Sequence, residues 1–182
     1  MQLDLKQVFQ LEGHTMPLEA ELDLTAEELY GACPFRKPIK LSGRVENQSR
    51  IVMLRYHASV GYTRECDRCL DEATETYELD FEHILVAVEE RDPHKASSED
   101  FAEDTSDELV FVPDYRLELD ELAREDILLM MPTRFLCRQE CKGLCPKCGC
   151  NLNHTQCGCD RSEPDPRLAA LRNLLELHEE ED

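Results

Sequence analysis

The sequence predicts an α+β protein with a twisted antiparallel sheet, a few helices and a cysteine-rich C-terminal segment. Apolar and polar residues alternate over long runs between residues 38 and 90, which is the period of strands with one buried face. Seven of the ten cysteines fall within residues 137–159. Hydrophobic residues make up 41% of the 182 residues, enough for the core of one ordinary domain with a small appendage.

Residues 1–37 are expected to form an entry segment of mixed structure with one short helix near residues 25–30. Thr25 and Glu28 have the spacing of a capping box, in which the threonine hydroxyl accepts from the backbone of Glu28 and the glutamate reaches back. Leu24 and Leu29 occupy the two positions of a hydrophobic staple around this box.

The strands are expected in three runs with a two-residue period, at residues 39–45, 52–62 and 77–87. A polar break, Asn47-Gln48-Ser49, separates the first two runs. Only Cys66-Asp67-Arg68-Cys69 and its neighbours lie between the second and third. This Cys-x-x-Cys pair is therefore predicted to lie at the tip of a long hairpin.

Residues 91–108 carry seven acidic and two basic residues and only one large apolar residue, Phe101. Such a stretch buries too little surface to order itself, so we expect a disordered acidic loop. A solvated linker is favoured over a docking segment.

Structure is expected to resume with a short strand at residues 109–112 and a helix capped by Asp120 that runs to Met131, before Pro132. Its buried face is predicted to be core rather than a ligand groove; the residues are Ala123, Ile127, Met130 and Met131, widened by Leu122. A final helix is expected over residues 165–180, with Asp165 as N-cap and Pro166 at its first position.

Composition bounds the partners and the compartment. Forty acidic against twenty basic residues give a net charge of −20, which repels phosphate backbones and suits a basic protein partner, or simply maintains solubility. No window approaches the roughly 20 apolar residues that span a bilayer, and the first 14 residues have neither the basic nor the apolar region of a signal peptide. We expect a cytoplasmic protein without membrane contact, whose cysteines are metal ligands rather than disulfides.

The cysteine spacing predicts zinc. Cys66/Cys69 and Cys145/Cys148 are Cys-x-x-Cys pairs, and the Gly149 that follows the second permits the tight turn of a zinc knuckle. Eight cysteines fit two four-cysteine sites. The preferred grouping places Cys145, Cys148, Cys157 and Cys159 in one local site, and Cys66, Cys69, Cys137 and Cys141 in the other.

Alternatives to this grouping stay open. A competing site uses Cys137, Cys141, Cys145 and Cys148 together. Of the remaining residues, Cys33 is expected to be a buried small residue, Cys150 could replace a neighbouring ligand, and His154 is a poorer ligand.

The sequence favours structural zinc and no enzymatic activity. Histidines are scattered, and neither the deaminase pattern nor His-Glu-x-x-His occurs. A redox role for Cys66 and Cys69 is disfavoured, because a thioredoxin-type pair opens a helix and a strand is expected here.

The cysteine block resembles the YceD family of large ribosomal RNA subunit accumulation proteins. The resemblance rests on residues 66–70, on residues 136–149, on Asn151-Leu152-Asn153, on residues 165–169 and on the Leu-x-Glu-Leu-Ala-Arg-Glu stretch before the block. It implies a non-enzymatic role in large-subunit rRNA accumulation, processing or assembly.

Two hypotheses for partners follow from this resemblance. In the first, the acidic chain binds a basic ribosomal protein or a large-subunit assembly intermediate. In the second, the C-terminal zinc ribbon contacts RNA directly through a local basic patch; its candidate residues are Arg134, Arg138, Lys142, Lys147 and Arg161. We accordingly divide the chain into a mainly antiparallel β domain, residues 1–132, and a zinc-ribbon segment with a C-terminal helix, residues 133–182.

Overall fold

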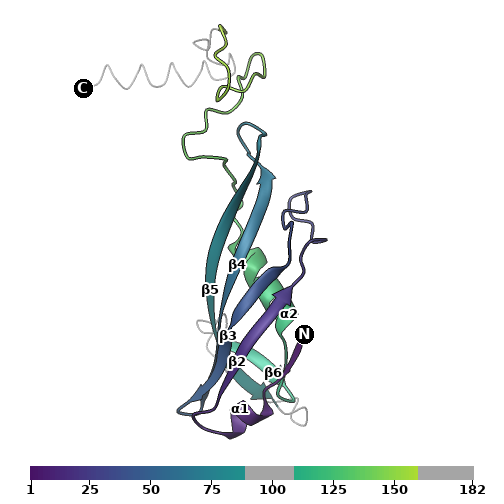
Figure 1. The fold of residues 1–182 in the computed structure, drawn as a ribbon, viewed down its shortest axis with the longest axis vertical. Coiled ribbons are helices and arrows are strands. Elements are labelled where there is room, and N and C mark those ends of the chain that lie inside the picture. Colours follow the sequence, from purple (N-terminus) through teal and green to yellow (C-terminus); the bar gives the residue numbers. More distant parts are fainter. Residues whose placement is uncertain (89–108, 160–182) are drawn as a thin grey trace, which may run out of the picture. The chain divides into compact units, whose positions relative to one another are not determined.

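A computed structural model of the protein describes residues 1–88 and 109–159, which form two compact units (Figure 1). Unit 1 consists of the described residues of Met1–Arg64 and Glu72–Phe135. Unit 2 consists of Glu65–Asp71 and the described residues from Leu136 onward. The predicted acidic loop at 91–108 and the predicted helix at 165–180 lie outside the described residues.

The main sheet has five strands in the order β2-β3-β4-β5-β6 (Figure 1). The strands are β2 (Thr15–Leu22), β3 (Ile39–Gln48), β4 (Ile51–Glu65), β5 (Glu72–Val88) and β6 (Leu109–Pro113). The three predicted strand runs, the strand at 109–112 and the hairpin tip at Cys66–Cys69 are confirmed.

The strand directions differ from the prediction at one edge of the sheet. β3 pairs antiparallel with both β2 and β4. β6 pairs parallel with β5, however, so a purely antiparallel sheet is wrong. A parallel neighbour requires a long crossover rather than a tight turn, and the chain between Val88 and Leu109 has the length for one.

Short elements complete unit 1. The strands β1 (Gln2–Asp4) and β7 (Arg116–Glu118) form a separate antiparallel pair. The helices are α1 (Lys6–Gln10) and α2 (Leu119–Met130). No helix within the described ranges is long and apolar enough to cross a membrane.

The apolar side of the sheet and α2 share one core, as the alternation predicts. On β4 every second residue is buried from Val52 to Tyr62, and α2 adds Ala123 and Ile127 to the same cluster. Burial of this continuous apolar surface is the main favourable free energy for folding of unit 1.

A buried polar cluster lies between α2 and the sheet. Asp126 of α2 accepts a hydrogen bond from the Tyr56 hydroxyl and lies 2.8 Å from His83 Nε2. Burial, followed by the contact with Asp126, raises the pKa of Tyr56, so the tyrosine stays a neutral donor. These polar contacts fix the position of α2 on an otherwise apolar face.

The predicted helix near residues 25–30 is wrong. Thr25 donates its backbone N–H to Asp23 Oδ1 at 2.9 Å and its hydroxyl to the same oxygen at 2.7 Å. The hydroxyl is thus held by the preceding carboxylate instead of capping a helix, and a turn with a hydrogen bond from Glu27 N–H to the Leu24 carbonyl forms instead.

The predicted helix at 120–131 is confirmed with corrected ends. α2 begins at Leu119, whose N–H donates to the Met1 carbonyl, and its N-cap residue Glu118 makes no side-chain cap. Asp120 is therefore not the cap; its carboxylate pairs with the N-terminal ammonium. Met131 is buried, but Met130 is 56% exposed, because the buried face follows the four-residue spacing from Leu119 to Met131.

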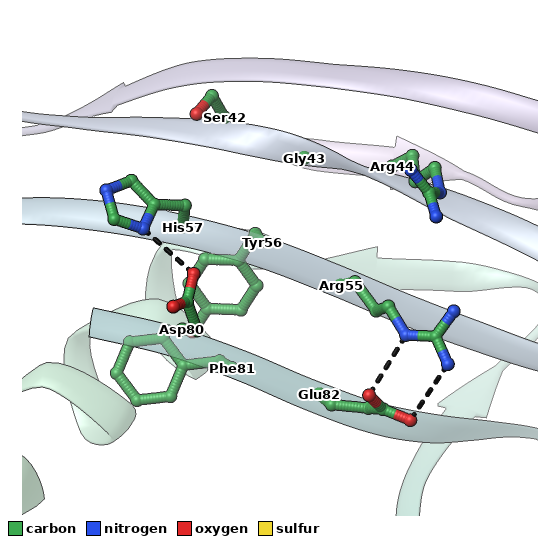
Figure 2. Close-up of a pocket in the computed structure, with 9 residues that line it drawn as sticks. All are labelled: Ser42, Gly43, Arg44, Arg55, Tyr56, His57, Asp80, Phe81 and Glu82. Carbon is green, nitrogen blue, oxygen red and sulfur yellow. Dashed lines mark hydrogen bonds and ion pairs between the residues drawn. The ribbon is translucent and has the colours of Figure 1, made fainter. Parts of the chain in front are cut away.

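The other face of the sheet carries paired charges around a shallow hollow of about 540 Å³ (Figure 2). Arg55 donates to both carboxylate oxygens of Glu82, at 2.9 and 3.1 Å. His57 contacts Asp80 through Nδ1 and Glu78 through Nε2, each at 2.9 Å. Since these charges pair with one another across β4 and β5, we interpret the hollow as a feature of the sheet surface rather than a ligand site.

Gly43 is required where β3 passes close to β4. A Cβ atom at this position would lie 2.1 Å from the Arg55 carbonyl oxygen and 2.6 Å from the Tyr56 Cα. Both are backbone atoms, so the strands would have to separate to accept a side chain.

We expect Gly43→Ala to lower the free energy of unfolding by about 1–3 kcal/mol through overpacking. The matched control is Gly61→Ala on β4, where a Cβ meets nothing within 4 Å. Urea denaturation of both variants provides the test, and equal stability of the two would contradict the proposed clash.

The contacts of His57 with Asp80 and Glu78 predict that the stability of the fold depends on pH. Asp80 first and Glu78 second raise the pKa of His57, so the folded state binds its proton more tightly than the unfolded state. The stabilisation is complete below the unfolded pKa of about 6.5 and is lost as the pH rises through the folded pKa. In urea titrations at a series of pH values, His57→Gln should therefore flatten the decline in stability above about pH 6.5.

The control for this pH series is His14→Gln, since His14 forms no ion pair with the part of the chain that the structure describes. An unchanged slope in His57→Gln would show that the two carboxylates do not act on this histidine.

Candidate metal centres

Unit 2 gathers eight thiols into two groups of four. The first, which we call site A, consists of Cys66, Cys69, Cys137 and Cys141. The second, site B, consists of Cys145, Cys148, Cys157 and Cys159. Within each group the sulfur atoms lie within 4.8 Å of one another. The structure thus forms the preferred grouping, whereas the competing set of Cys137, Cys141, Cys145 and Cys148 is divided between the sites.

The chain turns tightly to present the first two sulfur atoms of site A. Residues 66–71 connect β4 to β5, and Cys66 N–H donates to the Asp71 carbonyl while Leu70 N–H donates to the Cys66 carbonyl, each at 2.9 Å. Leu70 has a φ of 63° in this turn and is 59% exposed. A leucine in the left-handed region is strained, so the turn is held by its surroundings rather than by local preference.

The sulfur separations in site A fit a tetrahedral zinc ion. Cys66 Sγ lies 3.8 Å from Cys141 Sγ, and Cys69 Sγ lies 3.6 Å from Cys137 Sγ. Four sulfur atoms at about 2.3 Å from one zinc ion would be separated by about 3.8 Å at the tetrahedral angle. Simple packing of free thiols gives no reason for four sulfur atoms to gather at one point.

The thiol pKa values in site A are split. Burial opposes ionisation of Cys66, but backbone hydrogen bonds around it outweigh burial and lower its pKa to about 6. At Cys69 burial, together with the neighbouring thiols, raises the pKa to about 12. Without a cation the group therefore keeps some protons, and a bound dication would allow all four sulfur atoms to ionise.

Site B is built locally by a second knuckle. Gly149 follows Cys148 with a φ of 73°, and its N–H donates to the Cys145 carbonyl at 2.8 Å. Cys145 is buried, whereas Cys148 is exposed. Hydrogen bonds from Cys150, first from its backbone, lower the pKa of Cys148, and the Cys148 thiol in turn raises the pKa of Cys159 to about 12.

Residues outside the predicted ligand set surround site A. Arg68 Nη1 donates to the Cys141 carbonyl at 2.9 Å, and Asn153 Nδ2 donates to Cys141 Sγ at 3.3 Å. Asp71 accepts from Asn151 Nδ2 at 2.9 Å. The sequence does not predict these contacts, although Arg68 and the Asn151-Leu152-Asn153 motif belong to the stretches that carry the family resemblance.

The remaining cysteines and His154 differ in their surroundings. Cys33 is exposed, so the prediction that it is buried is wrong; it follows the turn closed by Leu29 and Ala32 rather than entering the core. The Cys150 thiol interacts with Cys148 and Cys157, beside site B. His154 belongs to neither sulfur group; its Nε2 lies 2.9 Å from Asp71 Oδ2.

The predicted basic patch is only partly within unit 2. Arg138, Lys142 and Lys147 belong to unit 2, Arg134 belongs to unit 1, and Arg161 lies outside the described residues. The described part of unit 2 contains four acidic and four basic residues, while that of unit 1 contains nineteen acidic and eleven basic ones. The negative charge of the described residues is thus concentrated in unit 1.

These features define a class of protein: an α+β unit built on a mixed sheet, and a small cysteine-rich unit whose two four-thiol groups have the geometry to hold metal ions. A family model described as large ribosomal RNA subunit accumulation protein YceD matches residues 54–175. The chain therefore belongs to the YceD family, as the resemblance in its cysteine block indicates. Members of this family are named for the accumulation of large-subunit ribosomal RNA.

Curated relatives extend this similarity. The chain is 29% identical over 161 residues to the chloroplastic YCED homolog 1 of Arabidopsis thaliana, covering 79% of this chain but only 50% of that protein. It is 26% identical to the uncharacterized protein YlbN of Bacillus subtilis, over 95% of this chain and 97% of the relative. It is 28% identical to the uncharacterized protein Rv2926c of Mycobacterium tuberculosis, over 75% and 62%. No solved structure matches.

The two groups predict a zinc content of two ions per chain. Changing Cys66 and Cys69 to serine, or Cys157 and Cys159 to serine, should remove about one ion, since a four-coordinate site does not survive the loss of two ligands. Elemental analysis of protein purified without chelator measures this content. Cys33→Ser is the matched control, because Cys33 lies outside both groups; a loss of zinc in this variant would contradict the assignment.

Proposed function

We propose that this protein is a non-enzymatic factor that supports accumulation of the large-subunit ribosomal RNA through its processing or assembly, with one structural zinc ion in each of sites A and B. The observation that carries the proposal is the family match over residues 54–175, which includes all eight thiols of both sites and the part of unit 1 that follows residue 53. The proposal also places the protein in a reducing cytoplasm. All ten cysteines are free thiols, which is the state that such a compartment maintains.

A structural rather than catalytic metal is supported by the ligands. Each site offers four cysteine sulfur atoms, a set that fills the coordination of zinc and keeps no position for water. A catalytic site instead combines an open position with a nearby base. Of the histidines that the structure describes, His154 lies near site A, and it pairs with Asp71 at 2.9 Å.

The partner that fits the described surface best is a basic ribosomal protein or a large-subunit assembly intermediate that carries one. Unit 1 has nineteen acidic and eleven basic residues in its described part, and its basic side chains Arg55 and Arg124 are already paired with Glu82 and Glu27. Excess carboxylates on this unit attract a cationic protein surface and repel bare RNA.

One observation favours a second candidate, direct RNA contact by unit 2. Its four basic residues balance its acidic ones, and Arg138, Lys142 and Lys147 lie within a short segment around the knuckles. Phosphate contacts by such residues would make binding strongly dependent on salt.

The test compares two triple variants in cells of the native host that lack the gene. Re-expression of the full chain should restore the ratio of large- to small-subunit rRNA. Under our proposal the variant Arg138→Gln/Lys142→Gln/Lys147→Gln restores it as well, and purified protein captures a basic ribosomal protein. The matched control changes Lys6, Lys37 and Lys40 of unit 1 to glutamine, which removes equal charge from exposed positions.

Two outcomes would decide against the proposal. In one, the full chain gives a salt-dependent RNA gel shift, and only the unit 2 variant loses both this shift and the ability to restore the rRNA ratio. That result would establish the RNA-binding alternative. An unchanged rRNA ratio in the deletion strain would overturn the role in large-subunit rRNA altogether.

A further inference from the structure

The loop between the knuckle of site B and its last two ligands also contacts site A. Residues 149–156 connect Cys148 to Cys157, so a metal ion in site B closes this loop at both ends. The loop contains Asn151 and Asn153, neither of which is a metal ligand in the groups described above.

Asn153 donates a hydrogen bond to one of the sulfur atoms of site A. Its Nδ2 lies 3.3 Å from Cys141 Sγ. The orientation of the amide is fixed by its other contacts, since Asn153 Oδ1 accepts from Lys142 N–H and the Asn153 N–H donates to Asn151 Oδ1, each at 2.9 Å. The N–H group therefore points at the sulfur, where it stabilises a thiolate.

Asn151 holds the other half of site A. Its Nδ2 donates to Asp71 Oδ2 at 2.9 Å and approaches the Cys69 carbonyl at 3.5 Å. Asp71 in turn accepts the Cys66 N–H through its own carbonyl at 2.9 Å. The two asparagines thus contact both chain segments that supply site A, the Cys66/Cys69 turn and the segment of Cys141.

Backbone contacts attach the same loop to the segment between the two sites. Leu152 N–H donates to the Gly143 carbonyl at 2.9 Å, and Leu144 forms an isolated antiparallel bridge with Asn151. Leu144 N–H donates to the Arg68 carbonyl at 3.1 Å, which continues the connection to the Cys66/Cys69 turn.

We propose that sites A and B bind their metal ions cooperatively, and that Asn151 and Asn153 are the positioning residues that couple them. The proposal rests on the zinc content of the proposed function. With site B empty, binding at site A must also meet the entropy cost of ordering the loop that carries both asparagines. With site B filled, that cost has already been met, and linkage requires the effect to be reciprocal.

The size of the effect follows from the role of outer-sphere hydrogen bonds. Loss of a partner that orients a metal ligand lowers metal affinity about 10- to 100-fold. Emptying site B with Cys157→Ser/Cys159→Ser should therefore weaken zinc binding at site A by about tenfold or more. Emptying site A with Cys66→Ser/Cys69→Ser should weaken site B by the same factor.

The experiment is a chelator competition with the full-length chain, in a double-mutant cycle. In the Asn151→Ala/Asn153→Ala background, site A should be weak already, and emptying site B should change its affinity little further. Gln156→Ala is the matched control: it removes an exposed amide from the same loop and should preserve the coupling.

A spectroscopic readout distinguishes positioning from general destabilisation. With ¹¹³Cd²⁺ in place of zinc, Asn153→Ala should shift the resonance of site A, whose sulfur loses a hydrogen bond, and leave that of site B in place. Equal affinities at each site whether the other is filled or empty would overturn the coupling but leave the zinc content intact. Absence of metal uptake in the unchanged protein would instead overturn the zinc part of the proposed function, and the coupling with it.

Discussion

Unit 2 depends on the convergence of four sulfur atoms that cannot all be ionised without a cation between them. Its buried cluster consists of Cys66, Cys69 and Cys141, packed by Leu136, Cys137 and Leu144. Among the described residues of this unit, that is too little apolar surface to hold a fold in water by itself. Under the proposed zinc content, the free energy of metal binding would supply much of the free energy that folds this part of the chain. The hydrogen bonds around the sulfur atoms then select one arrangement of the chain.

Unit 1 obtains its stability differently, and this explains which predictions succeeded there. The alternation along β4, from Val52 to Tyr62, is a direct consequence of one buried face, so the sequence was sufficient to predict it. The direction of β6 depends on its pairing with β5, and no local pattern reveals it. At Thr25 two local signals competed, and the nearer carboxylate of Asp23 displaced the capping box.

The candidate site shows the same division between local and distant information. Cys-x-x-Cys spacing was enough to predict four-sulfur groups, because the turn itself brings two sulfur atoms together. The Cys66/Cys69 turn contacts Cys137 and Cys141 across 68 to 75 residues of sequence. No local pattern distinguishes this grouping from the competing set. The asparagine donors were missed because an amide in a loop has many partners, and only the fold shows that Asn153 faces a sulfur atom.

This difference in sequence separation also gives the two sites an order of assembly. Site B closes a short loop, from Cys145 to Cys159, whereas site A must bring together segments far apart in the chain. Loop-closure entropy favours the local site, so metal should bind there first and fix the loop that carries Asn151 and Asn153. Site A then forms against donors that are already ordered. The local knuckle would thereby act as a template for the distant one.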